Sequence, residues 1–242
     1  MKDKTLVLIT SALFIGPKGE ILTAPAAHRL KRLHKTISAV TQLGFDHIRV
    51  LDNTIPATFK LDFVKIATLS TSPISFADNE FELNGPSRLE TVLLGQSLAY
   101  LKPLLVKFTH ILKLSAGYEV KNLQPILAKA QNGVVFRMGN PFRTKIKFCL
   151  TSFYILPVTH FANMCDFFLD NLADMSNTKP LEYYLYCFVQ QVPHRFIKVP
   201  YPRLDADFLS SGRSTADFDY RLKESVFKFI AKFGFYAYQF KG

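Results

Sequence analysis

The chain has 242 residues, of which 48% are hydrophobic and 20% charged, a composition typical of a folded globular protein and not of a disordered one. Thirty Lys and Arg side chains against 19 Asp and Glu give a net charge of +11, which favours an anionic partner. The three cysteines are widely spaced among apolar residues, which excludes a disulfide framework and indicates reduced thiols, as in a cytoplasmic protein.

The first fifty residues predict a βαβ unit. Residues 6–9 are apolar on both faces, as in a central strand of an α/β sheet. Apolar residues at helical spacing predict a helix from about 26 to 43, which Gly44 ends, and residues 47–51 predict a second strand. This order predicts an α/β fold whose central sheet is mainly parallel.

The remaining pattern continues the α/β alternation after a less regular segment over 54–85. A helix is predicted over 87–101, with Ser87 as its N-cap and Glu90 completing a capping box. Further strands are predicted at 109–114, 134–136 and 146–152, and further helices at 160–174, from about 180, and over 218–233.

Polar residues end the first two predicted strands. Thr10 and Ser11 close the first strand, and Asp52 and Asn53 close the second. Because the carboxyl ends of parallel strands meet at one edge of a sheet, this edge is the expected place for a nucleotide. Simple turn chemistry explains Asp52 and Asn53 equally well. No dinucleotide-binding or Walker-type glycine motif is present.

The positive charge is unevenly distributed. No Asp or Glu occurs over residues 21–45, where Arg29, Lys31, Arg32 and Lys35 cluster, and none occurs over 120–165. Such fields attract phosphates, anionic lipids or nucleic acids. A solvated helix face is the alternative for any single basic residue.

The end of the chain is basic and rich in aromatic residues. We therefore divide the chain into a catalytic domain over 1–218 and a helix with its tail over 219–242. This amphipathic segment either packs on the core of the domain or lies on an anionic membrane surface.

Several segments together resemble the small cytoplasmic glycosyltransferases of bacterial capsule and lipopolysaccharide synthesis, which have a GT-A-like, Rossmann-like fold. They include the Asn84-Gly85-Pro86-Ser87-Arg88-Leu89-Glu90 segment that opens a helix and the Ile111-Leu112-Lys113-Leu114-Ser115-Ala116-Gly117-Tyr118 strand and loop. The chain departs from the family pattern in two places. The arginine of its Gly-Arg-Tyr motif is missing, and an Asp-x-Asp sequence at 205–207 lies too late in the chain.

The resemblance implies a transferase that moves a sugar from a nucleotide-sugar to a glycan or glycolipid acceptor. A leaving nucleoside diphosphate needs cations, and with no well-placed Asp-x-Asp sequence we expect Lys and Arg to supply them, although a divalent cation stays open. Glu182 is the candidate base for the acceptor hydroxyl and His194 the second candidate, while a favourable charge at a helix N-terminus is the other interpretation of Glu182. The candidate nucleotide-sugar contacts are Thr10, Ser11, Arg29, Asp52, Asn53, Arg88, Lys113, Ser115, Gly117 and Tyr118.

This hypothesis predicts a cytoplasmic protein that can associate peripherally with the inner membrane. It predicts no nucleic-acid partner. Two alternatives remain open. One is a basic module that binds nucleic acid, and the other is an inactive protein with a GT-A-like fold.

Overall fold

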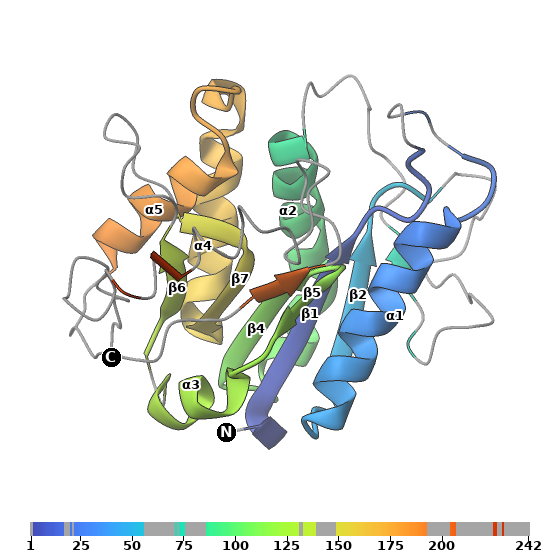
Figure 1. Ribbon diagram of the computed structural model, residues 1–242. Coiled ribbons are helices and arrows are strands. Elements are labelled where there is room, and N and C mark those ends of the chain that lie inside the picture. The colour runs from blue at the N-terminus through green and yellow to red at the C-terminus, as the bar shows by residue number, and fades with distance from the viewer. Residues whose placement is uncertain are drawn as a thin grey trace.

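The predicted first strand lies inside a six-stranded sheet with the order β3-β2-β1-β4-β7-β6 (Figure 1). The computed structural model describes residues 2–16, 20, 22–55, 71, 73–75, 86–130, 133–138, 149–192, 204–206, 225, 226 and 229. The strands of the sheet are β1 (Thr5–Ser11), β2 (Ile48–Asp52), β3 (Pro73–Ser75), β4 (His110–Ser115), β6 (Val135–Met138) and β7 (Cys149–Pro157). Strands β1 to β4 pair in parallel, and β7 pairs antiparallel with both β4 and β6. The predicted α/β fold with a mainly parallel sheet flanked by helices is confirmed.

Helices cover both faces of this sheet, as Figure 1 shows. They are α1 (Ala27–Gln42), α2 (Pro86–Leu105), α3 (Leu123–Ala130), α4 (Val158–Asp170) and α5 (Leu181–Gln191), with short 3-10 turns η1 (Lys2–Lys4) and η3 (Leu172–Asp174). A separate antiparallel ladder joins β5 (Tyr118–Val120) to β8 (Leu204–Ala206).

Two hydrophobic cores, one on each face, follow from the alternation of side chains along the strands. Val7 and Ile9 of β1 point to the core formed with α1 and α3, and Leu6 and Leu8 point to the core formed with α2, α4 and α5. All seven residues of β1 are buried, which explains why the strand is apolar on both faces. We call these two faces the α1 side and the α2 side.

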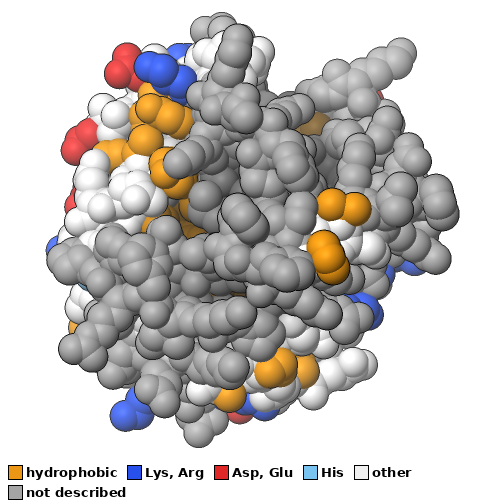
Figure 2. All heavy atoms as spheres, turned by 60° about the vertical axis from the view of Figure 1, so that its left-hand side comes forward, with side chains coloured by type: hydrophobic (Ala, Val, Ile, Leu, Met, Phe, Trp, Pro, Cys, Tyr) orange, Lys and Arg blue, Asp and Glu red, His pale blue; other side chains and the backbone are white. Residues whose placement is uncertain are grey.

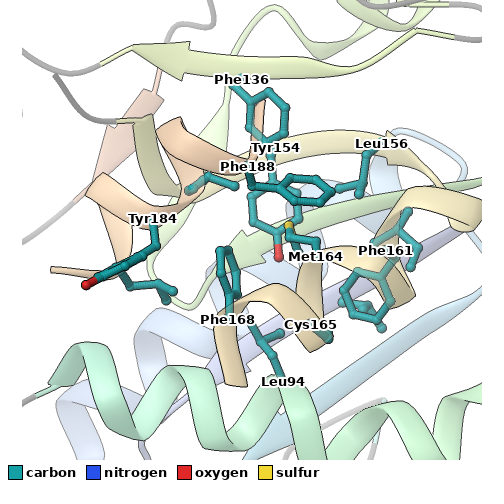
Figure 3. Close-up of a cluster of buried hydrophobic side chains, with 14 of the residues drawn as sticks. Leu94, Phe136, Tyr154, Leu156, Phe161, Met164, Cys165, Phe168, Tyr184 and Phe188 are labelled. Carbon is teal, nitrogen blue, oxygen red and sulfur yellow. The ribbon is translucent and has the colours of Figure 1, made fainter. Parts of the chain in front are cut away.

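The second core forms an aromatic layer on the α2 side. Tyr154 of β7 lies among Phe136, Met164 and Phe188 (Figure 3), and the ring centroids of Phe136 and Tyr154 are 5.9 Å apart. A side chain of this size, only 1% exposed, fixes the position of β7 against α4 and α5.

The pairing of β6 with β7 contains an irregularity. The partner of Phe136 is Tyr154, but the partner of the next residue, Arg137, is Leu150. Residues 151–153 of β7 are therefore outside the regular pairing with β6, as in a β-bulge, a device that redirects side chains beside functional sites.

The chain order of the strands reverses between β1 and β4. From β1 the chain continues to β2 and β3 on one side, and it then returns to β4 on the other side of β1. In doubly wound sheets the connections at such a point leave in opposite directions, so a crevice forms at the carboxyl ends of the two strands. Thr10 of β1 faces Ser115 of β4 at this edge.

The sequence placed most long elements correctly and missed the short ones. The strand expected over 146–152 runs instead over 149–157, and β3, β5, β8 and α3 were not expected. The helix expected from 87 to 101 runs from 86 to 105, so Ser87 lies inside it and does not occupy the N-cap. All three cysteines are free thiols, and Cys149 and Cys165 are buried.

The predicted C-terminal helix lies mostly outside the described residues. Within it, Ser225, Val226 and Phe229 are helical, and the side chains of Val226 and Phe229 are 42% and 61% exposed. On the face seen in Figure 2, hydrophobic side chains that are described reach the surface in several separate small groups. Among the described helices, none has both the length and the apolar character needed to cross a bilayer. The division at 218 and the membrane role of the tail stay predictions.

Candidate functional site

The side chains predicted from the strand ends meet at the carboxyl edge of β1, β2 and β4, but they divide between its two sides. Consecutive residues of a strand point to opposite faces. Thr10 therefore points to the α2 side with Lys113 and Ser115, and Ser11 points to the α1 side with Asp52. The edge carries two neighbouring groups of polar side chains, one on each side of the sheet.

Lys113 is the centre of the group on the α2 side. Its ammonium is 0% exposed, and it forms an ion pair with Glu90 of α2. Nζ also donates to Ser115 Oγ at 2.9 Å and to the Thr151 carbonyl at 2.6 Å. An ammonium has three N–H donors, so these acceptors use all of them. Lys113 places its charge at the edge while it holds the surrounding groups in position.

The carboxylate of Glu90 joins this group to β1. Its Oε1 accepts from the Thr10 hydroxyl at 3.2 Å as well as from Lys113, and its side chain stays 21% exposed. The ring of Tyr154 lies beneath the ammonium, with its centroid 5.9 Å from Lys113 Nζ. This aromatic face and the three acceptors compensate the buried positive charge.

Glu182, the predicted base, enters the same group from the first turn of α5. Thr151, in the irregular part of β7, donates from its hydroxyl to Glu182 Oε1 at 3.2 Å, while its carbonyl accepts from Lys113. Burial raises the pKa of Glu182, and the negative charge of Glu90 acts in the same direction. Hydrogen bonds, including the one from Thr151, and the positive charge of Lys113 act in the opposite direction. Glu182 is thus a carboxyl group with a raised pKa beside a fixed cation. This arrangement suits proton transfer. We call Glu90, Lys113, Thr151 and Glu182 the Lys113 cluster.

On the α1 side, Asp52 organises the loops that follow the strands. Its Oδ2 accepts from the Ser11 hydroxyl at 2.6 Å and from the Leu13 amide at 2.8 Å. Its Oδ1 accepts from the Thr54 amide at 2.8 Å and from the Thr54 hydroxyl at 2.7 Å. The side chain is 0% exposed. These four hydrogen bonds correspond to the turn interpretation of Asp52 and engage both carboxylate oxygens inside the protein.

Arg29 of α1 lies near this carboxylate, and Arg32 is its neighbour on the helix. Burial and the neighbouring Arg32 lower the pKa of Arg29, and Asp52 acts in the opposite direction. Arg29 is half-buried, and its Nε is buried without a hydrogen-bond acceptor among the described residues. Since arginine stays charged in proteins, the side chain is a cation in an unfavourable position.

Arg32 lies against the turn between β4 and β5, where this chain lacks the arginine of the Gly-Arg-Tyr pattern. Gly117 has φ +95°, and a Cβ at this residue would lie 2.7 Å from Arg32 Nη2, too close for contact. Thr36 of α1 holds the same turn, because its hydroxyl accepts from the Gly117 amide at 2.9 Å and lies 3.0 Å from the Tyr118 carbonyl. Only glycine combines this backbone conformation with the close approach of the guanidinium.

Arg88 and Asn53 hold elements together around the edge. Arg88 donates from Nε to the Met175 carbonyl and from Nη2 to the Ala173 carbonyl, both at 3.0 Å. Asn53 donates from Nδ2 to the Leu89 carbonyl at 2.9 Å. These contacts tie the start of α2 to η3 and to the end of β2, so the Arg88 guanidinium is engaged by backbone carbonyls. His194 lies outside the described residues.

The sequence interpretation missed four contributors, namely Glu90, Thr151, Arg32 and Thr36. A signal for Glu90 was present. Lys113 stands alone in an apolar strand, and a buried lysine requires a counter-ion. Glu90 is the only acidic residue of α2, the helix that follows β3. The other three depend on how α1 and β7 pack, which periodicity does not reveal.

Among the residues that the structure describes, no group of three or more His, Cys, Asp or Glu side chains could hold a metal ion. No protein-family model and no curated protein matches the chain. Among solved structures, a Bacillus anthracis protein provisionally assigned as a glucose-1-phosphate thymidylyltransferase, in complex with sucrose, matches with a TM-score of 0.49 and 7% identity. The match covers 86% of this chain and 92% of the other. A similarity of this degree assigns no activity, so function has to be argued from the chain's own residues.

Proposed function

We propose that this protein is a glycosyltransferase that moves a sugar from a nucleotide-sugar to a hydroxyl group of a surface-glycan acceptor of the capsule or lipopolysaccharide type. The observation that carries the proposal is the Lys113 cluster, at the edge where the strand order reverses. It combines a partly buried carboxyl group, Glu182, with a fixed ammonium and a second carboxylate. Such paired acidic groups in different environments are typical of sites that transfer protons.

The step needs one proton acceptor and one place for negative charge. The acceptor hydroxyl oxygen forms a bond to the anomeric carbon, and its proton passes to the ionised carboxylate of Glu182. The bond between the anomeric carbon and the phosphate oxygen breaks, and its electron pair leaves with the nucleoside diphosphate. This single displacement inverts the anomeric centre, and it needs positive charge near the leaving oxygen.

We assign proton transfer and donor binding to different sides of the edge. On the α2 side, Glu182 and the Lys113 cluster accept the proton. On the α1 side, the donor nucleotide-sugar lies over the ends of β1 and β2 and the turn at Gly117. Lys113 acts through its charge, since its N–H groups are bonded within the protein. It favours the ionised form of Glu182 while burial keeps the pKa of Glu182 raised, a balance suited to a general base.

The test is a turnover assay on the full chain. Sugar nucleotides based on UDP, GDP and CMP are supplied in turn, and release of the nucleoside phosphate is measured for the wild type and for Glu182→Gln. Loss of a general base lowers turnover by about 100-fold or more, so this variant should be slower by at least that factor. Asp166→Asn is the matched control, because Asp166 is an exposed carboxylate of α4 on the same side of the sheet.

Two results would refute the proposal. The first is turnover in Glu182→Gln equal to that of Asp166→Asn. The second is that none of the nucleotide-sugars is turned over by the wild type and none raises its melting temperature, as any bound ligand should.

A further inference from the structure

The guanidinium pair Arg29 and Arg32 has an electrostatic arrangement that differs from an ordinary solvated helix face. Both side chains are half-buried on consecutive turns of α1, and their like charges disfavour one another. Segment 21–45, which contains both arginines, has no acidic residue of its own. Lys31, between them in sequence, points into solvent and does not share this arrangement.

The carboxylate that opposes Arg29 is already engaged. Asp52 is the acidic group whose charge acts on Arg29, but its two oxygens accept four hydrogen bonds from Ser11, Leu13 and Thr54. Asp52 therefore attracts Arg29 by its charge, but its oxygens already accept hydrogen bonds from other groups. The buried Nε of Arg29 has no acceptor among the described residues. An anion placed here would supply both the charge and the acceptors that Asp52 does not provide.

The position of Arg32 gives the site its shape. Its guanidinium lies on the backbone of Gly117, and Thr36 fixes that turn through its hydroxyl. The planar fork is thus supported on one side by the turn between β4 and β5, and Arg29 stands one helical turn away. Planar guanidinium groups held in this way suit the oxygens of phosphate groups, which they bind in pairs.

We infer that Arg29 and Arg32 form a binding site for a diphosphate group, and that this site holds the diphosphate of the donor without help from a divalent cation. The assignment to a donor rests on the proposed function, whereas the affinity for a diphosphate does not. Two linked phosphates spread their charge over a length that two adjacent guanidiniums can share, so a diphosphate fits better than a single phosphate. The same chemistry could come from a nucleoside diphosphate or from a lipid-linked diphosphate.

The probe is inorganic pyrophosphate, added to the full chain in the presence of EDTA, with the melting temperature and the dissociation constant as readouts. We expect pyrophosphate and UDP to stabilise the wild type, and phosphate and uridine to do so much less. Arg29→Met and Arg32→Met should each bind pyrophosphate about 10- to 100-fold more weakly, the loss typical of a charge-assisted contact. Lys31→Met, which removes the same charge from an exposed position of α1, should bind as the wild type does.

A second pair of variants distinguishes a loss of binding from a loss of folding. Arg29→Lys and Arg32→Lys keep the charge but lose the fork, so they should retain the unliganded melting temperature and bind pyrophosphate with intermediate affinity. A stronger response to UDP than to pyrophosphate assigns the site to a nucleotide. An equal response assigns it to the diphosphate alone, and a lipid-linked diphosphate then becomes the alternative source.

The inference is overturned if pyrophosphate fails to stabilise the wild type in EDTA, or if Arg32→Met and Lys31→Met respond alike. These results are separate from those that test the proposed function. Glu182→Gln should lose turnover but keep the full response to pyrophosphate, because Glu182 lies on the α2 side. If the protein binds pyrophosphate through the arginines but turns over no sugar nucleotide, the diphosphate site is supported and the proposed function is refuted.

Discussion

The two sides of the carboxyl edge handle charge in opposite ways. On the α2 side, Lys113 is fully buried and its donors are all bonded to protein groups. On the α1 side, Arg29 and Arg32 are half-buried, and the nearby carboxylate is bonded to neutral donors. A buried charge must be compensated within the fold, whereas a half-buried one can be compensated by a ligand. The charge on the first side is therefore compensated within the protein, whereas on the second side the proposed diphosphate would supply the compensation.

The largest effect should come from breaking the compensation on the α2 side. Lys113→Met keeps the length of the side chain but leaves Glu90 without its cation, and removing one partner of a buried pair costs about 3 kcal/mol or more. Urea unfolding measures this loss. Lys121→Met is the control, since Lys121 pairs with Glu119 at 2.7 Å on the surface and its loss should cost less than about 1 kcal/mol. Adding Glu90→Gln to Lys113→Met should restore part of the stability. Similar losses in both lysine variants would mean that burial does not distinguish the two pairs.

A somewhat smaller effect should follow on the α1 side from Asp52→Asn. In asparagine an NH₂ group, which only donates, replaces one of the two carboxylate oxygens. The two donors that this oxygen served, which include either the Leu13 amide or the Thr54 amide, then lose their acceptor. We expect a loss of about 2 kcal/mol in the free energy of unfolding. Asp46→Asn, at an exposed position before β2, should change stability little. An unchanged stability in Asp52→Asn would show that the carboxylate does not organise these loops and is available to a ligand.

The smallest effect concerns pH. The folded-state pKa of Glu182 lies above its unfolded value near 4.5, so the native protein binds more protons than the unfolded chain between these two pKa values. This group therefore makes the protein more stable as the pH falls through that interval, and the contribution is lost as the pH rises through the folded pKa. Glu182→Gln should melt at or above the wild-type temperature at neutral pH, and the difference should vanish toward pH 4.5.

The difference in melting temperature between the wild type and Glu182→Gln, measured as a function of pH, separates the effect of Glu182 from that of the other titrating groups. Asp166→Asn is the control, because Asp166 is an exposed carboxylate outside the Lys113 cluster. A Glu182→Gln variant that is less stable than the wild type at neutral pH would show that the ionised carboxylate stabilises the fold, contrary to the effect of burial.

The sequence by itself determined the framework of this protein. Apolar strands alternating with amphipathic helices require a mainly parallel sheet, and the carboxyl ends of parallel strands share an edge. For that reason Thr10, Ser11, Asp52 and Asn53 could be placed at one edge from the sequence alone. These inferences depend on residues close together in the chain, whose spacing is visible directly.

Only the tertiary structure decided which partner each polar group takes. Glu90 fits a local capping pattern with Ser87, yet its carboxylate pairs with Lys113 on the adjacent strand. Asp52, expected to meet a nucleotide, is engaged by its own loops, and Arg32 reaches Gly117 from a helix far away in sequence. The physical reason is that strand register and helix packing bring together residues from 23 to 105 positions apart. At those separations the free energy of burying or pairing a charge outweighs local preference.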